Sequence, residues 1–512
     1  MSLISSSGGL RLAVVGCTHG ALDIIYDTVS QLELENDYVV DAILCCGDFQ
    51  AIRNTYDLET MVTPNKYRKM EDFWRYYKGD KVAPKLTIFI GGNHEAVAHN
   101  RELYYGGWVA PNIYFLGYSG LINVGGLRIG GFSGIYDHKF FRSGHHELTP
   151  YGKNDLHSAM YVRLYELWKL AHLTGHLDAL ISHDWPEYIA YFGSVDTLLR
   201  NKPFFKTSLD ENTLGCEAYL ALMKLLKPTH WFSGHMHTHF TARVCHASSS
   251  LNASTSSSSS KTKDLQTLLT SPQSVDKSSS SASSSTSKPL VGSKKKDTST
   301  GRKQRQHNAT EALDGGAATN FLALDKPLPG RAFLEVVHFP FASGERETEP
   351  LLDLEGNPLP LGPRLCYDLE WLSIIRAAHS HFPNHKGGAK LLPQIHANTI
   401  KKHRDWIVKE RLGGDPFNWQ ALEIKRSLFV QSAATYTEGA EPIRVGPGVG
   451  PQADVFLDWL ELEKHALAGT VPVQLHPNKQ RQILASTSAA PSSSLGPSTN
   501  GAEASSASIE NL

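Results

Sequence analysis

The sequence predicts an α/β domain built in layers. Short apolar runs bounded by turn residues, which are typical of buried strands, alternate with longer segments whose apolar residues recur at helical spacing. Polar side chains that can bind metal ions directly follow several of these runs, where open α/β sheets tend to place their ligand sites. The strand-like runs are Leu12–Val15, Ala42–Cys46, Leu86–Ile90, Ala179–Ile181 and Trp231–Ser233, and the clearest helical segments are Leu22–Leu34 and Tyr161–Leu173.

Composition bounds the class of protein. The chain has 512 residues, more than one typical domain, and its 50 Lys and Arg nearly cancel its 51 Asp and Glu. The whole-chain charge therefore predicts no polyanionic partner, although a local basic patch stays open. The six cysteines show no CxxC pair, which favours a reducing compartment. We see no signal peptide and no transmembrane run, and expect a soluble, intracellular protein without a membrane partner.

Composition also divides the chain. Residues 10–247 are dense in apolar, aromatic and glycine residues and form the first expected domain. Ser and Thr dominate residues 248–316, which contain basic clusters and are expected to be disordered, because they cannot bury enough apolar surface. The alternation of strands and helices returns in residues 317–470. A second segment rich in Ser, residues 478–512, is again expected to be disordered.

The segment 317–470 is expected to pack on the first domain. Thr319–Leu324 and Arg331–Phe339 look like strands, and the second would leave an unpaired edge if it stood alone. Asp368–His379 reads as a helix, as does the basic and amphipathic segment Lys401–Leu412. The basic residues of that last helix could help to hold RNA or could form a solvated face, and both interpretations remain open.

The ends of five strand-like runs carry the chemistry. Asp48 follows the second run, and its two carboxylate oxygens could bridge two cations. Cys17 and His19 stand two apart, as do His235 and His237, so that each pair can face the same side of an extended chain. The candidate side chains, in chain order, are Cys17, His19, Asp48, Asn93, His94, His183, His235 and His237.

Each of these residues has an ordinary interpretation by itself. A single His after a strand is usually a hydrogen-bonded structural residue, and Asn93 beside a glycine is usually a turn former. Without His94, the set sums to four imidazoles, one thiol, one carboxylate and one amide oxygen. That is enough for two cations that share Asp48 and keep open positions, as a two-metal phosphoester hydrolase requires.

The order of these motifs resembles that of the calcineurin-like metallophosphoesterases, with Cys17 in place of their first Asp. Together with the extended motifs Gly47–Asn54, Gly91–Ala96 and Ser182–Pro186, this departure resembles the RNA lariat debranching enzymes. The resemblance implies a four-layer αββα sandwich over residues 10–247. It also implies that residues 317–470 form a C-terminal debranching-enzyme domain.

The same resemblance implies roles for the candidate ligands. One ion would be held by Cys17, His19, Asp48 and His237, and the other by Asp48, Asn93, His183 and His235. A soft thiolate favours Zn²⁺ or Fe²⁺ over Mg²⁺ at the first site. Mn²⁺ is a further alternative at the second site, which has only nitrogen and oxygen ligands. An alternative is that Cys17 does not bind and leaves its ion under-coordinated.

His94 is implied to be the general acid rather than a ligand. An imidazole suits a proton donor that works near neutral pH. The alternative for His94 is a supporting hydrogen bond to the metal ligands.

Residues 133–163 form the second informative region. Aromatic side chains interleaved with Lys, Arg and His suit single-stranded RNA, whereas the alternative is a surface excursion with a few buried aromatics. The resemblance implies that this region is the lariat recognition loop. Its candidate substrate contacts are Tyr136, His138, Lys139, Arg142, His145 and His146.

Arg53 and Asn54 follow the bridging Asp48 closely in the sequence. They are expected to touch the scissile phosphate, with a structural salt bridge as the alternative for Arg53.

The expected activity is hydrolysis of the 2′–5′ phosphodiester at the branch point of excised intron lariats, which gives linear RNA for turnover after pre-mRNA splicing. The expected partners are branched intron RNA and post-splicing complexes, not DNA. Alternatives are a two-metal phosphoesterase for phosphoprotein or nucleotide, and a catalytically inactive RNA-binding splicing factor.

The clusters Lys294–Lys296 and Arg302–Arg305 bear on localisation. They read as a nuclear import signal or as a solubilising charge run. An intron substrate favours the nucleus, with the cytoplasm left open.

Overall fold

The computed structural model describes residues 8–246, 317–340, 348–352, 358–386, 392–438 and 450–464. The predicted Ser-rich insert 248–316, with its two basic clusters, lies outside the described residues. The predicted tail 478–512 does too, so both expectations of disorder stay predictions.

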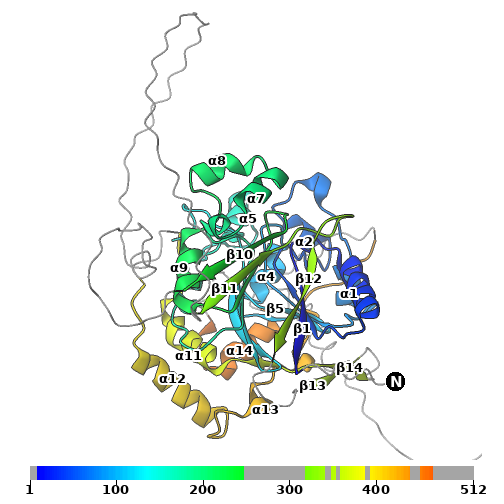
Figure 1. The fold of residues 1–512 in the computed structure, drawn as a ribbon. Helices are drawn as coiled ribbons and strands as arrows, with labels where there is room; N and C mark the ends of the chain where they lie inside the picture. Colours follow the sequence, from blue (N-terminus) through cyan, green and yellow to red (C-terminus); the bar gives the residue numbers. More distant parts are fainter. Residues whose placement is uncertain are drawn as a thin grey trace, which may run out of the picture. The chain divides into compact units, whose positions relative to one another are not determined.

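Within the described residues the strands form two large sheets and one two-stranded ribbon (Figure 1). The first sheet has the order β12 (Leu334–Pro340), β1 (Gly9–Val15), β2 (Ala42–Cys45), β3 (Leu86–Phe89), β5 (Ile113–Phe115) and β4 (Gly107–Ala110). The second has the order β10 (Phe240–Cys245), β11 (Ala318–Ala323), β9 (His230–Ser233), β8 (Ala179–Ser182), β7 (Leu127–Phe132), β6 (Ser119–Val124) and β15 (Leu365–Tyr367). The ribbon pairs β13 (Thr348–Leu352) with β14 (Pro358–Pro363).

Most helices are short and lie between the strands in the sequence. The α-helices are α1 (Leu22–Asn36), α2 (Thr55–Glu59), α3 (Phe73–Lys78), α4 (Val97–Glu102), α5 (Lys153–Ala159), α6 (Leu164–Leu170), α7 (Val195–Asn201), α8 (Phe205–Asp210), α9 (Glu217–Leu226), α11 (Leu369–Ala378), α12 (Ala397–Glu410), α13 (Trp419–Leu422) and α14 (Pro451–Trp459). The 3₁₀ helices are η1 (Asn65–Tyr67), η2 (Ile189–Phe192), η3 (His379–His381) and η4 (Arg426–Leu428). No helix in these described ranges is long and apolar enough to cross a membrane.

The two sheets pack face to face with helices outside, which confirms the four-layer αββα sandwich. Strand β1 shows why, because its alternate side chains point to opposite faces. Leu12 and Val14 join the core between the sheets, where they meet side chains of β7, β8 and β9. Ala13 and Val15 face the other way, into a cluster with apolar residues of α1 and α3. On the far side of the second sheet, α6, α9 and α11 cover a third cluster.

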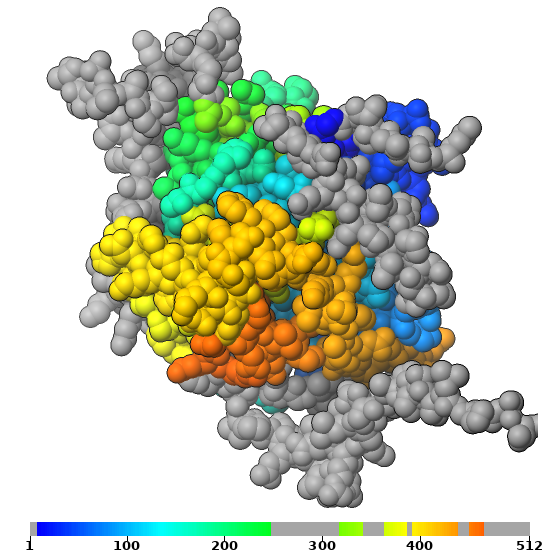
Figure 2. All heavy atoms as spheres, turned by 90° about the horizontal axis from the view of Figure 1, so that it is seen from below, coloured from blue at the N-terminus to red at the C-terminus, as the bar shows by residue number. Residues whose placement is uncertain are grey.

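The segment after residue 316 packs on the sandwich, as predicted, because three of its strands join the two sheets. Strand β12 pairs antiparallel with β1, so that Gly9 faces Pro340 and Val15 faces Leu334. Strand β11 lies between β10 and β9, and β15 pairs with β6. The later described residues, yellow to orange in Figure 2, gather over one face of the molecule.

Candidate metal centre

The predicted ligands lie at one edge of the two sheets because five parallel strands end there. β1, β2 and β3 are neighbours in the first sheet, and β8 and β9 are neighbours in the second. Each of the five strands is followed by a turn that carries one or two of the ligands. We call the metal centre the group of Cys17, His19, Asp48, Asn93, His183, His235 and His237.

The backbone of these turns is strained in a way that aims the side chains at one another. His19, Asp48, His235 and His237 all have positive φ angles, of 46°, 48°, 62° and 46°. Such left-handed conformations are unusual for residues other than glycine and cluster at functional sites. They turn the chain sharply after β1, β2 and β9, so that the polar side chains point back over the ends of these strands.

Two glycines make room for the ligands. A Cβ atom on Gly47 would lie 2.3 Å from Nδ1 of His183, and one on Gly92 would lie 2.3 Å from Oδ1 of Asp48. Neither distance is compatible with a side chain, so glycine is required at both positions by the close approach.

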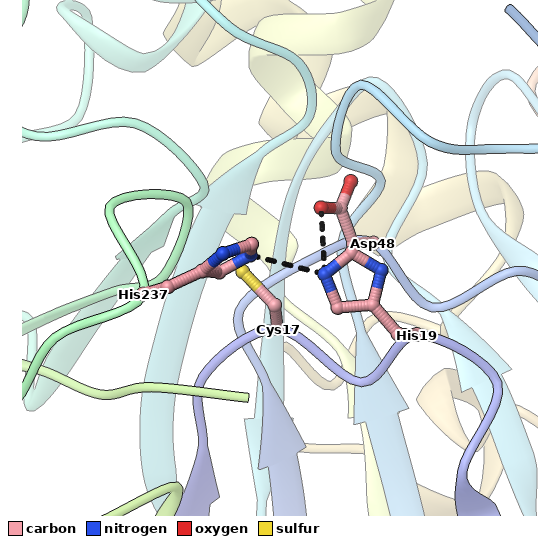
Figure 3. A group of neighbouring side chains, drawn as sticks. All are labelled: Cys17, His19, Asp48 and His237. Carbon is pink, nitrogen blue, oxygen red and sulfur yellow. Dashed lines mark hydrogen bonds and ion pairs between the residues drawn. The ribbon is translucent and has the colours of Figure 1, made fainter. Parts of the chain in front are cut away.

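The first donor set is visible in Figure 3, where Cys17, His19, Asp48 and His237 point toward one another. One possible ligand atom from each of the four lies within 4.8 Å of all the others. Nε2 of His19 lies 3.0 Å from Nε2 of His237 and 3.6 Å from Oδ2 of Asp48. Sulfur, nitrogen and carboxylate atoms that converge in this way fit a divalent cation.

The second donor set meets the other oxygen of the same aspartate. Nε2 of His183 lies 3.4 Å from Oδ1 of Asp48 and 3.2 Å from Oδ1 of Asn93. The ring of His235 lies 5.0 Å from the ring of His183. Nδ1 of His183 donates to the carbonyl of Cys46 at 2.7 Å, so Nε2 is the nitrogen that would offer a lone pair to a cation.

The electrostatics also suit cations. Burial by itself would raise the pKa of Asp48, but the neighbouring His183 and His19 hold it well below its usual value. Burial lowers the pKa of His19 to about 4 and that of His237 to about 3, so both rings are neutral at pH 7. Neutral imidazoles and an ionised carboxylate are the forms that bind metals.

Cys17 is the exception in its protonation state. Burial, followed by the charge of Asp48, raises the pKa of its thiol well above the usual value. The His235 amide donates to its sulfur at 2.9 Å. Because a coordinating thiol is deprotonated outright, a cation bound at this site would displace the thiol proton.

Glu95 supports the metal centre through hydrogen bonds to two of its turns. Its carboxylate accepts the amide hydrogens of Phe49, Gln50 and Gly92 at 2.7, 2.8 and 2.9 Å. Burial and the nearby Asp48 raise its pKa to about 7. Glu95 therefore ties the turn after β2 to the turn after β3. The sequence showed Glu95 inside a motif, but no rule of spacing assigned it this role.

His94 borders the metal centre without belonging to either donor set. Its amide donates to Oδ1 of Asp48 at 2.8 Å, and its ring lies 5.6 Å from the ring of His19. Nδ1 of His94 lies 2.9 Å from the hydroxyl of Thr63, a residue that the sequence analysis did not single out. The expected role of His94 as the general acid stays a prediction.

Arg53 and Asn54 are placed differently from the expectation of phosphate contact. The side chain of Arg53 is 1% exposed, and it bonds the carboxylates of Asp57 and Glu102 at 2.8 Å each. Asn54 caps α2 by accepting from the amide of Asp57 at 3.1 Å, and it donates to the carbonyl of Ala434 at 2.7 Å. Arg53 thus takes the alternative role of a buried salt-bridge partner, and neither side chain is accessible to a substrate here.

Residues 133–163, which we call the recognition loop after the role that the resemblance implies, start next to the metal centre. The Gly134 amide donates to the carbonyl of Gly91 at 2.9 Å, and the Tyr136 amide donates to Oδ2 of Asp184 at 3.2 Å. Both acceptors belong to turns that carry ligands. The first part of the loop is therefore fixed beside the metal centre.

The predicted contacts within the recognition loop divide by exposure. His138 and Lys139 are exposed, and Tyr136, Arg142 and His146 are partly buried. His145 differs from the expectation, because it is buried and its Nε2 lies 2.9 Å from the carboxylate of Glu166.

Lys326 is a cation that the sequence analysis missed. Lys326 follows β11. The preceding residue, Asp325, packs against Gly16 in the turn after β1, because a Cβ atom on Gly16 would lie only 2.2 Å from the carbonyl oxygen of Asp325. After burial, the charge of Lys326 is among the causes that lower the pKa values of His19 and His237. Its origin in the distant segment 317–340 explains why no local motif revealed it.

Two family models match the chain. Residues 10–239 match the model described as calcineurin-like phosphoesterase, and residues 316–465 match that of the lariat debranching enzyme, C-terminal domain. The first match and the donor sets together indicate a metal-dependent phosphodiesterase that uses divalent ions.

Curated relatives carry the same family name. The chain is 37% identical over 401 residues to the lariat debranching enzyme of Arabidopsis thaliana, covering 78% of this chain and 75% of the relative. It is 41% identical to that of Drosophila melanogaster, covering 82% and 70%. It is 40% identical to that of Homo sapiens, covering 72% of this chain but only 54% of the relative. By these matches over most of its length, the chain belongs to the lariat debranching enzyme family.

Proposed function

We propose that this protein hydrolyses the 2′–5′ phosphodiester bond at the branch point of excised intron lariats, giving linear RNA for turnover after splicing. The observation that carries the proposal is the position of Asp48. One of its oxygens faces His19 and the other faces His183, at 3.6 and 3.4 Å, so a single carboxylate joins two donor sets. The lariat debranching enzymes to which the chain is similar supply the substrate class.

Two divalent ions fit the donor sets. Cys17, His19, Asp48 and His237 would hold one, and Asp48, Asn93, His183 and His235 the other. The thiol favours Zn²⁺ or Fe²⁺ at the first site, and the nitrogen and oxygen donors of the second also accept Mn²⁺. When bound, such a pair neutralises the charge of the phosphate oxygens and makes a nearby water a better nucleophile.

His94 serves as the general acid in this proposal. Thr63 engages Nδ1 of its ring, so Nε2 is the nitrogen that faces the leaving group. The attacking water gives one proton to the solvent and bonds to phosphorus opposite the 2′ oxygen, the bond between phosphorus and that oxygen breaks, and Nε2 of His94 gives the oxygen its proton. The phosphate stays on the freed 5′ end, and the branch nucleotide regains its 2′ hydroxyl.

The RNA would lie along the recognition loop. His138 and Lys139 are exposed there, and Tyr136 is anchored beside the metal centre. Aromatic and cationic side chains suit unpaired bases and phosphates. A nuclear site of action, with import through Lys294–Lys296 and Arg302–Arg305 and with post-splicing complexes as partners, is part of the same proposal.

The test compares purified wild-type protein with Asp48→Ala and His94→Ala on branched RNA. Linear RNA and an aryl phosphate serve as control substrates, and bound metal is measured in each preparation. We expect cleavage at the branch only, with two metal equivalents for each wild-type chain. Unreduced cleavage by either variant would contradict its role. Faster turnover of the aryl phosphate would favour a general phosphoesterase, and lariat binding without metal or cleavage would favour an inactive RNA-binding factor.

A further inference from the structure

His94 is held by a neighbour that lies in a different part of the chain. Oγ1 of Thr63 lies 2.9 Å from Nδ1 of His94, and Thr63 is buried. Thr63 belongs to the segment between α2 and η1, whereas His94 follows β3. A hydrogen bond to one ring nitrogen fixes the orientation of an imidazole and which nitrogen keeps its proton.

The segment that carries Thr63 is itself clamped. Nε of Arg68 donates to the carbonyl of Thr63, and Nη2 of Arg68 donates to the carbonyl of Met61, each at 2.7 Å. Two charge-assisted bonds from one guanidinium to carbonyls two residues apart hold this short segment in one conformation. The position of the Thr63 hydroxyl therefore depends on Arg68.

A small apolar cluster ties the same segment to the turn of His94. Met61 and Ile52 pack with Ala96, which stands two residues after His94, and all three are buried. Thr63 and His94 are thus held against each other by packing on one side and by the Arg68 clamp on the other.

From this geometry we infer that Thr63 is a positioning residue for the general acid, and that Arg68 holds Thr63 in place. This inference rests on the proposed function of His94. When Nδ1–H donates to the Thr63 hydroxyl, the second proton of the imidazolium sits on Nε2. His94 gives that proton to the 2′ oxygen as the bond to phosphorus breaks, and it keeps its bond to Thr63 throughout. Without the hydroxyl the ring can rotate, and fewer encounters place Nε2 at the leaving oxygen.

The test uses two substrates that differ in one atom. The first is branched RNA, and the second is the same RNA with sulfur in place of the leaving 2′ oxygen. A thiolate leaves without a proton, so only the first substrate needs the general acid. All rates are compared as variant over wild type, and kcat and KM are measured separately.

We expect Thr63→Val to lower kcat on the oxygen substrate by about 10-fold or more, with KM unchanged and with less than about a 2-fold change on the sulfur substrate. Thr63→Ser, which restores a hydroxyl, should recover most of the loss. Arg68→Gln should show a smaller selective loss, and it carries the test if Thr63→Val does not fold. Thr60→Val is the matched control, because Thr60 is buried in the same segment and bonds Asp57 rather than His94.

The His94→Ala variant separates the two levels of the argument. A selective loss of about 10²- to 10⁴-fold on the oxygen substrate supports the general acid. An equal loss on both substrates would refute the role of His94 and the inference with it. A selective loss for His94→Ala but an equal loss, or none, for Thr63→Val would overturn the inference alone.

Discussion

The metal centre and the recognition loop lie side by side and are both rich in polar residues, yet their side chains are used differently. In the metal centre the predicted ligands come directly after strands, and their donor groups face one another. In the recognition loop the side chain of His145 contacts Glu166 and that of Arg163 pairs with Glu147. Lys139, in contrast, is exposed to solvent. A strand therefore fixes the direction of the residue that follows it, whereas a long loop uses part of its charge to hold itself together.

Loss of the shared carboxylate should have the largest effect and would test the first half of this comparison. Asp48→Asn removes the charge that both donor sets face, so we expect debranching to fall by about 10⁴-fold or more. Single-turnover cleavage of branched RNA and the metal content of the purified protein measure the effect. Asp210→Asn is the control, because that side chain is 65% exposed and pairs with the exposed Lys206. Full metal content with normal cleavage in Asp48→Asn would contradict a shared aspartate.

The next effect concerns Glu166, a buried carboxylate that pairs with Lys169 and accepts a hydrogen bond from His145 of the recognition loop. Glu166 lies 2.8 Å from Nζ of Lys169 and 2.9 Å from Nε2 of His145, and all three side chains are buried. Glu166→Gln leaves the Lys169 charge without its partner, so we expect the free energy of unfolding to fall by about 3–5 kcal/mol. Urea unfolding measures it. Lys206→Gln breaks an exposed pair and should cost less than about 1 kcal/mol. Equal costs in the two variants would show that the loop is not held by its buried charge.

The same buried groups should make the protein sensitive to acid. Burial lowers the pKa of His145 to about 4, below the usual value of 6.5. Between these pH values the unfolded chain binds a proton that the folded chain does not, so stability is lost as the pH falls from about 6.5 to about 4.

Glu147 extends this loss to lower pH. Burial by itself would raise its pKa, but Arg163 together with His145, Ser158 and Arg101 lowers it to about 2. The stability that Glu147 contributes is therefore present above about pH 4.5 and disappears toward pH 2.

For His145 we expect the free energy of unfolding to fall by on the order of 2 kcal/mol between pH 6.5 and 4, measured by urea unfolding at several pH values. The loss should be smaller in His145→Gln, and an unchanged pH profile in that variant would contradict the assignment.

The smallest effect should come from the exposed part of the recognition loop. Lys139→Gln should weaken binding of branched RNA by about 3- to 10-fold and reduce the salt slope by about 1, with kcat unchanged. Fluorescence anisotropy at several salt concentrations measures both quantities. His145→Gln, in the buried part of the same loop, should leave the affinity unchanged in folded protein. Equal losses of affinity in the two variants would contradict the proposal that the exposed side chains of the recognition loop bind RNA and the buried ones do not.

The sandwich and the metal centre could be predicted from the sequence because both depend on local patterns. Apolar runs such as Ala42–Cys46 and the ligands after them lie within a few residues of each other, and parallel strands bring their carboxyl ends together. Pairing of β12 with β1 was not visible in this way. An unpaired edge predicted that β12 needs a partner, but no local signal names which strand provides it.

Partners from distant segments account for what the sequence could not show. Arg53 stands next to the Asp48 turn, and only the folded chain brings Glu102 to it. Lys326 and Thr63 show the opposite case. They belong to segments without a recognisable motif, and packing of the folded chain brings them close to the metal centre. Charge type and position in the sequence therefore predicted which side chains converge better than they predicted which side chains are exposed.

The pairing of β1 with β12 has a consequence for synthesis on the ribosome. The strand that starts the first sheet leaves the ribosome early, while its outer neighbour is still untranslated behind the whole insert 248–316. At about 5–20 residues per second, the wait lasts on the order of tens of seconds. During that time the nascent chain shows an open edge next to the future metal centre. Chaperones that shield this edge, or a shorter insert, should raise the yield of active protein.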